Sequence, residues 1–277
     1  MVEAVVRAQG LYSLKLTART EVWNAQLSGG RWVEARQLHD GSLFLRASCE
    51  RSVDEARFLL ALDDDTSEFH LRFARDPLLG PSARMLRGLR TTRTSTVAQA
   101  ALRAICGQLI QSRRAREIER VVIRACGESP PTREALARLS PAALTGCGLA
   151  ESRAATLARL VRRVDLESLK TSMAATALER LERERGIGLW SVGVIALQGL
   201  GRFDAGLVAD LSLVKLFASL RGRWTEQPAE TAELLSPYGE WQGLASVVLL
   251  AGFTRGLVPG ASADRARLVR GAYGPAA

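Results

Sequence analysis

Two features of this sequence carry residue types that could take part in chemistry. The first is Asp210, which follows a hydrophobic stretch and begins the apolar segment Leu211–Leu213. A carboxylate there can cap a helix, or it can stabilise a positive charge in a reacting molecule. The second is Gly186-Ile187-Gly188, which separates two segments with helical spacing. Glycines allow positive φ angles and close backbone approach, and the N–H groups that open the next helix suit a phosphate. An ordinary helix–helix corner has the same pattern.

The spacing of these features joins them to Trp190. Trp190 lies two residues after Gly188 and twenty residues before Asp210. The sequence thus predicts a helix, a tight turn and a second helix, followed by a carboxylate at the start of a third.

The charge of the chain is unevenly distributed. Residues 1–84 hold 11 Lys/Arg against 12 Asp/Glu, whereas residues 85–277 hold 27 against 17. All of the net charge of +9 therefore comes from the later part, which favours a polyanionic partner such as nucleic acid. A soluble surface from an Arg-biased genome is the alternative, because Arg outnumbers Lys 35 to 3.

Composition excludes several classes of protein. With 47% hydrophobic and 24% charged residues, the chain is globular. The longest uncharged stretch, 186–201, is shorter than the roughly 20 apolar residues of a membrane span, and the N-terminus lacks a signal-peptide pattern. Four widely spaced cysteines without a C-x-x-C pair, and only two histidines, argue against zinc, iron–sulfur and disulfide scaffolds. We expect a cytoplasmic protein without a membrane partner.

The elements that must position these residues change in type along the chain. Up to about residue 75, alternation and turn signals predict mainly strands, and from about residue 85 the apolar spacing is helical. The predicted strands are 11–16, 22–27, 31–35 and 42–47. The predicted helices are 52–62, one after Asp63–Asp65, 97–109, 115–126, one from 130, one from 140, 152–164, 171–182, one from 190, 210–220, 228–236 and 240–253.

The hairpin and the aspartate together resemble the signature of the helix-hairpin-helix DNA glycosylases, in particular the DNA-3-methyladenine glycosylase II branch. Further segments, spanning about 60–255, are similar to that branch. They are Leu59-x-x-Leu62-Asp63-Asp64-Asp65, Asp76-Pro77-Leu78, Gly88-Leu89-Arg90, Ala101 to Ile110, and Pro237-Tyr238-x-x-Trp241-x-x-x-Ala245.

The resemblance implies an α+β fold. A small antiparallel sheet domain (1–84) would precede a mostly α-helical glycosylase core of two lobes (85–277), with the helix-hairpin-helix at 178–195. It also implies a monomeric enzyme of base excision repair that removes alkylated purines such as 3-methyladenine from double-stranded DNA. The base leaves the stack before its N-glycosidic bond is hydrolysed.

The resemblance also assigns roles to individual residues. Asp210 would be the catalytic carboxylate, and Trp190 would line the base pocket by stacking on a cationic base or would simply pack the hairpin. Gly186, Gly188 and Ser191 would contact the DNA. Leu109 would be the wedge that fills the gap left by the base, or else a core leucine. No cofactor is required, although Na⁺ or K⁺ could bind the backbone carbonyls of Glu182, Glu184 and Ile187 when DNA is bound.

Position 190 separates two reactions within this superfamily. Relatives with lyase activity carry there a lysine that forms a Schiff base, whereas this chain has Trp190, which favours hydrolysis alone. Lys215 is close to Asp210 in sequence but does not fit that motif. Val194 and Leu250 replace aromatic residues common in the branch, which leaves the preferred lesion open. A glycosylase for oxidised or deaminated bases, a DNA-binding protein with weak or lost catalysis, and an unrelated helical protein are the alternatives.

Overall fold

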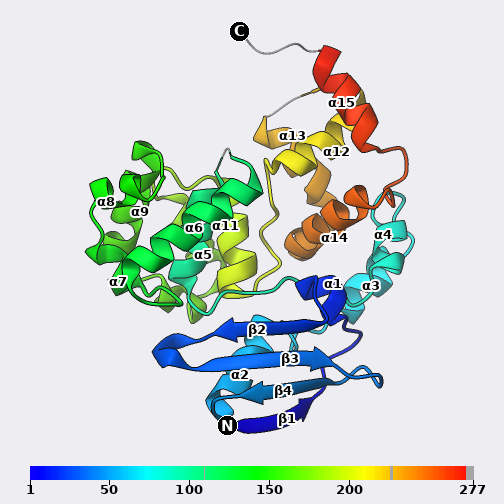
Figure 1. Cartoon of the computed structure of the whole chain (residues 1–277). Coiled ribbons are helices and arrows are strands. Elements are labelled where there is room, and N and C mark those ends of the chain that lie inside the picture. The colour runs from blue at the N-terminus through cyan, green and yellow to red at the C-terminus, as the bar shows by residue number, and fades with distance from the viewer. Residues whose placement is uncertain (109, 225–226, 273–277) are drawn as a thin grey trace.

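The first part of the chain forms an antiparallel sheet of four strands. The computed structural model describes residues 1–108, 110–224 and 227–272. The strands lie in the spatial order β1-β4-β3-β2 (Figure 1). Their bounds are β1 (Val2–Val6), β2 (Val22–Gln26), β3 (Trp32–Gln37) and β4 (Leu43–Ala47). Three of the predicted strands match β2, β3 and β4, whereas β1 is not among the predicted elements.

The prediction of a strand at 11–16 is wrong, because this segment enters helix α1 (Leu14–Ala18). The Ser13 hydroxyl accepts the N–H of Leu16 at 3.2 Å and so caps the helix. Leu14 and Thr17 are buried one helical turn apart. The short run of alternating residues fits both periods, and the capping serine decides in favour of the helix.

One face of the sheet is covered by helix α2 (Glu50–Leu59), which contacts β3 and β4. Leucine side chains from the sheet and from α2, with Val33, Ala35 and Ala47, form the core between these two layers. Burial of this apolar surface is the main force that holds the sheet domain together.

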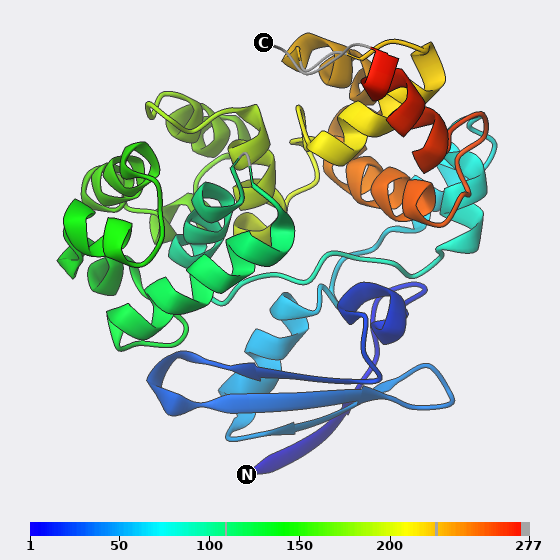
Figure 2. The same cartoon turned by 45° about the horizontal axis from the view of Figure 1, so that its top comes forward.

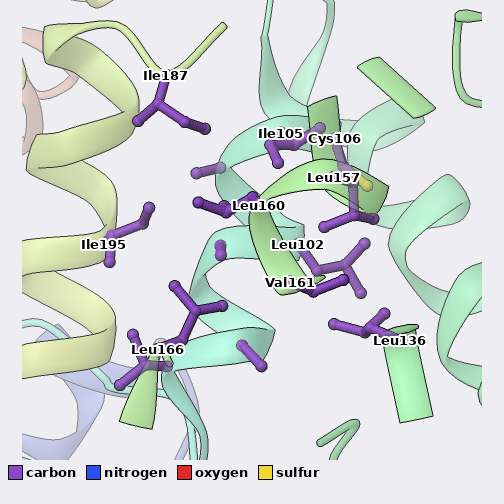
Figure 3. Close-up of a cluster of buried hydrophobic side chains, with 14 of the residues drawn as sticks. Leu102, Ile105, Cys106, Leu136, Leu157, Leu160, Val161, Leu166, Ile187 and Ile195 are labelled. Carbon is purple, nitrogen blue, oxygen red and sulfur yellow. The ribbon is translucent and has the colours of Figure 1, made fainter. Parts of the chain in front are cut away.

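A first helical lobe is built around α5, whose side chains are buried on nearly all sides. Figure 3 shows Ile187 and Ile195 facing Leu102 and Leu160 across its core. The helices are α5 (Val97–Gly107), α6 (Ser112–Cys126), α7 (Arg133–Arg138), α8 (Pro141–Gly146), α9 (Glu151–Arg163), α10 (Ala174–Glu182) and α11 (Leu189–Ile195). A 3₁₀ turn lies at Glu167–Lys170, and α11 continues as a π-helical turn, Ala196–Leu200.

The second helical lobe draws on two distant parts of the sequence. Phe69 and Phe73 share a core with residues such as Leu213, Leu216 and Leu244. The helices are α3 (Ser67–Phe73), α4 (Gly80–Met85), α12 (Leu211–Arg221), α13 (Pro228–Leu235), α14 (Gln242–Thr254) and α15 (Ala263–Ala272). Helix α15 was not among the predicted elements. In Figures 1 and 2 the two lobes lie side by side above the sheet.

These observations confirm the predicted fold class, a small antiparallel sheet followed by a mostly helical core of two lobes. The predicted boundary at residue 84 falls within α4, and the core of the second lobe begins before it, at α3. Within the described residues, no helix is both long enough and apolar enough to cross a bilayer.

A buried arginine joins the N-terminal domain to the helical part. Arg90 is only 1% exposed, and its guanidinium donates to the backbone carbonyls of Gln9, Leu11 and Ala61. The backbone N–H of Arg90 donates to the Thr17 hydroxyl at 3.0 Å. Burial lowers the pKa of Arg90, because the charged form loses hydration. The three carbonyls replace that hydration and tie separate segments to one side chain.

We expect Arg90→Met to lower the free energy of unfolding by about 3 kcal/mol, because three buried carbonyls lose a charged donor. Urea denaturation measures the change. The matched control is Arg87→Met at an exposed neighbouring position, which should stay within about 0.5 kcal/mol of the wild type. Equal midpoints for the two variants would show that Arg90 does not carry this junction.

Candidate active site

The predicted hairpin is present between α10 and α11. The N–H of Ile187 bonds the carbonyl of Glu184 at 3.0 Å, which closes the turn. Gly186 has φ +86° and lies against Thr156, so that a Cβ at position 186 would come within 2.5 Å of the Thr156 hydroxyl. Gly186 is therefore required by both its backbone angle and its packing.

Gly188 plays a different part in the turn. Its φ is −89°, which any residue can adopt, so the positive φ that glycine allows is used at Gly186 and not at Gly188. Apart from its chain neighbours, no atom of the described residues lies within 4 Å of the position that a Gly188 Cβ would occupy. The backbone here faces open space at the start of α11, which leaves room for a ligand to approach it closely.

The side chains of Asp210 and Trp190 meet although they belong to different lobes. The indole Nε1–H of Trp190 donates to Asp210 Oδ2 at 3.0 Å. The other oxygen, Oδ1, accepts the backbone N–H of Ser212 at 2.8 Å and caps α12. Asp210 is thus an N-cap and also one half of a contact between the lobes. Within residues 1–108, 110–224 and 227–272 each oxygen has one donor, and since a carboxylate can accept about four hydrogen bonds, each can accept another.

Two glycines allow this approach. A Cβ at Gly193 on α11 would lie 2.3 Å from the carbonyl oxygen of Gly206, in the segment that leads to Asp210. A Cβ at Gly107, the last residue of α5, would lie 2.6 Å from the ring of Trp190. Both contacts exist only because side chains are missing, and together they fix the indole and the carboxylate relative to each other.

Ser191, predicted to contact DNA, is buried and serves the interior of the hairpin. Its hydroxyl accepts the side-chain N–H of Gln108 at 3.0 Å. The same Gln108 nitrogen donates to the carbonyl of Gly186 at 2.9 Å, and Arg153 donates to the carbonyl of Gln108 at 2.8 Å. Gln108 therefore links the end of α5 to the hairpin. Leu109, the predicted wedge, lies outside the described residues.

The remaining predicted positions are distributed over both lobes. Glu184, one of the three residues whose carbonyls were expected to bind a cation, uses its carbonyl in the hairpin turn. Glu182 is the last residue of α10, and the Ile187 side chain is part of the core of the first lobe. Val194 is buried in that same core, and Leu250 packs against the core of the second lobe.

The cysteine next to Gly107 is unreactive. Cys106 precedes Gly107 and is fully buried, and burial raises the pKa of its thiol to about 12. A thiol is nucleophilic only as the thiolate, so Cys106 stays protonated and is not a nucleophile at neutral pH.

Sequence reasoning missed Gly107, Gln108, Arg153 and Gly193 as parts of the site. Gln108 lies within a segment that carries the resemblance, but its spacing gives no sign of a bond to residue 186. Gly193 occurs inside an apolar helix and Gly107 at the end of one, where a glycine is only a general signal for close packing.

We expect Gly193→Ala to destabilise the protein by about 2 kcal/mol, because the new methyl group must displace the backbone at Gly206. Urea denaturation measures this loss. Gly188→Ala is the control, since its φ suits alanine and its Cβ meets open space, and it should change stability by less than about 0.5 kcal/mol. A tolerated Gly193→Ala would show that the lobes do not depend on this contact.

Comparison with known proteins gives matches to solved structures. No family model and no curated protein matches the chain. The structure is similar to a 3-methyladenine DNA glycosylase from Archaeoglobus fulgidus (TM-score 0.76, 18% identity, 91% of this chain and 98% of that one). It is also similar to an 8-oxoguanine glycosylase/lyase from Clostridium acetobutylicum, in complex with double-stranded DNA (TM-score 0.74, 18% identity, 92% and 96%). A DNA-3-methyladenine glycosidase from Bacillus halodurans matches with TM-score 0.54 and 21% identity over 72% of this chain and 96% of that one. The chain has the fold of the helix-hairpin-helix DNA glycosylases.

Proposed function

We propose that this protein is a DNA glycosylase that hydrolyses the N-glycosidic bond of alkylated purines in double-stranded DNA. The observation that carries the proposal is the Asp210 carboxylate, held at the start of α12 by Ser212 and Trp190. It lies one hydrogen bond from the helix that follows the hairpin, within the fold of known DNA glycosylases. The excess of basic residues after residue 84 supplies an attraction for the DNA backbone.

The chemistry assigned to Asp210 follows from the charge that develops in the reaction. Breaking the bond between C1′ and the base leaves positive charge on the sugar, in an oxocarbenium-like transition state. A fixed carboxylate stabilises that charge, and its free lone pairs can orient a water toward C1′. The two donors hold the carboxylate in place before the reaction starts, so that little reorganisation is needed.

The hairpin would hold the DNA backbone beside this carboxylate. The open space at Gly188 lets a phosphate approach the backbone N–H groups there, because within the described part of the chain no side chain lies close to this position. A phosphate bound at the hairpin would fix the strand near Asp210 while the damaged base is out of the stack.

Trp190 supports hydrolysis without strand cleavage. An indole cannot form a Schiff base, and its N–H is already donated to Asp210. We propose that Trp190 orients the catalytic carboxylate; its role in stacking on the base stays a prediction. Hydrolysis suits cationic alkylated bases, which are good leaving groups and need no general acid.

A glycosylase for an oxidised base is the second candidate. It is favoured by the similar TM-score of the match to an 8-oxoguanine glycosylase/lyase. Val194 and Leu250 also stand where the alkylpurine branch usually has aromatic residues. Release of bases from methylated DNA and from DNA that contains 8-oxoguanine distinguishes the two substrates.

Asp210→Asn should lower the rate of base release by about 10²–10³, because a preorganised negative charge is lost from the transition state. Asparagine caps helices well, so folding and binding to lesion DNA should be preserved. Single-turnover release of 3-methyladenine measures the effect. Asp204→Asn is the control, since that carboxylate lies in the same segment and pairs with Arg202 at 2.7 Å. Near-normal turnover by folded Asp210→Asn would leave Asp210 only as an N-cap.

Turnover should leave an intact strand with an abasic site that breaks only after alkali treatment. The physical reason is the missing amine at position 190. Borohydride added during turnover should therefore trap no covalent protein–DNA complex. Lys215→Ala is the informative variant, because Lys215 is on α12, close to Asp210 in sequence. A trapped complex that disappears in Lys215→Ala would show a lyase with a displaced nucleophile.

A further inference from the structure

Arg159, on α9, reaches across to the hairpin. Its Nη2 donates to the backbone carbonyl of Arg185 and lies 3.4 Å from the hydroxyl of Thr156. Thr156 is the residue on which Gly186 rests. A positive charge from a neighbouring helix is thereby fixed to the turn that is proposed to hold the DNA backbone.

Three successive carbonyls of the turn have protein donors. Glu184 accepts the N–H of Ile187 at 3.0 Å, Arg185 accepts Arg159, and Gly186 accepts Gln108 at 2.9 Å. A monovalent cation at the carbonyls of Glu182, Glu184 and Ile187 would share this turn with the Arg159 guanidinium, which is bonded to Arg185 and repels a second positive charge. The charge on this turn therefore disfavours a bound monovalent cation.

Arg159 gives the turn a net positive charge. Residues 182–185 hold two glutamates and two arginines, so this segment has no net charge. Arg159 adds one positive charge from outside this segment. Nη2 provides its contacts to the turn, so the three N–H groups on Nε and Nη1 have no hydrogen-bond partner among the described residues. A planar guanidinium with free donors matches a phosphate well.

We propose that Arg159 is the resident cation of the hairpin. It holds the Arg185 carbonyl with one nitrogen and offers its charge and remaining N–H groups to the DNA phosphate that the turn receives. DNA binding then needs no monovalent cation from solution. This inference rests on the proposed function, because it presupposes that the hairpin binds the DNA backbone.

The test compares two salts by fluorescence anisotropy with duplex DNA that carries an abasic-site analogue. The Kd is measured in potassium chloride and in tetramethylammonium chloride at equal ionic strength, since the organic cation is too large for a carbonyl site. The wild type should bind equally in both salts. Arg159→Gln should bind about three- to tenfold more weakly, and its slope of log K against log salt should fall by about 0.9, the value of one phosphate contact.

Two further variants separate charge from structure. Arg163→Gln is the matched control, because Arg163 is exposed on α9 one turn further along, and it should keep the slope of the wild type. Arg159→Lys should restore the slope, because it restores the charge, even if the bond to Arg185 weakens.

Each possible outcome decides one question. Wild-type binding that is weaker in tetramethylammonium than in potassium would overturn the inference, whether or not Arg159→Gln folds. Equal slopes for Arg159→Gln and Arg163→Gln would also overturn it. A wild-type protein that binds no duplex DNA in either salt would instead contradict the proposed function.

Discussion

The hydrogen bond between Trp190 and Asp210 is the interaction on which the site depends. It joins a side chain at the start of α11, in the first lobe, to the residue that caps α12, in the second. The two residues meet only if the lobes approach closely, which is possible because Gly193 lacks a side chain, while the missing side chain of Gly107 leaves room for the Trp190 ring within the first lobe. Glycines within helices, usually a cost to stability, are here the condition for the site.

Asp210 both caps α12 and accepts a hydrogen bond from the other lobe. An N-cap carboxylate is normally a structural group, fixed by the backbone N–H groups of its own helix. In this molecule one oxygen serves that purpose and the other faces the first lobe. The hydrogen bond that caps the helix thus also orients the carboxylate, and the remaining lone pairs of the carboxylate can accept further hydrogen bonds.

Sequence patterns predicted most of the helices, the hairpin and the position of Asp210, since each has a local signal. Gly186 marks the turn, and Asp210 stands where a cap is needed. Long-range contacts have no such signal. The bonds of Gln108 to the hairpin join residues far apart in the sequence, so only the folded chain reveals them. The strand predicted at 11–16 is wrong for the opposite reason, because its signal is local but ambiguous. A short alternating run fits both the strand and the helix period, and the cap at Ser13 favours the helix.

The second lobe is built from segments that precede and follow the first lobe in the sequence. This order has a consequence for synthesis on the ribosome. Helices α3 and α4 leave the ribosome early, but the core around Phe69 and Phe73 is completed only when α12 to α14 follow. The whole first lobe is translated in the meantime and has its own core, so it can fold as a unit. While the first lobe is translated, the Phe69 and Phe73 side chains lack part of their core and are accessible to chaperones and to other nascent chains. Asp210 also follows the first lobe in the chain, so Trp190 can already be in place when the carboxylate leaves the ribosome.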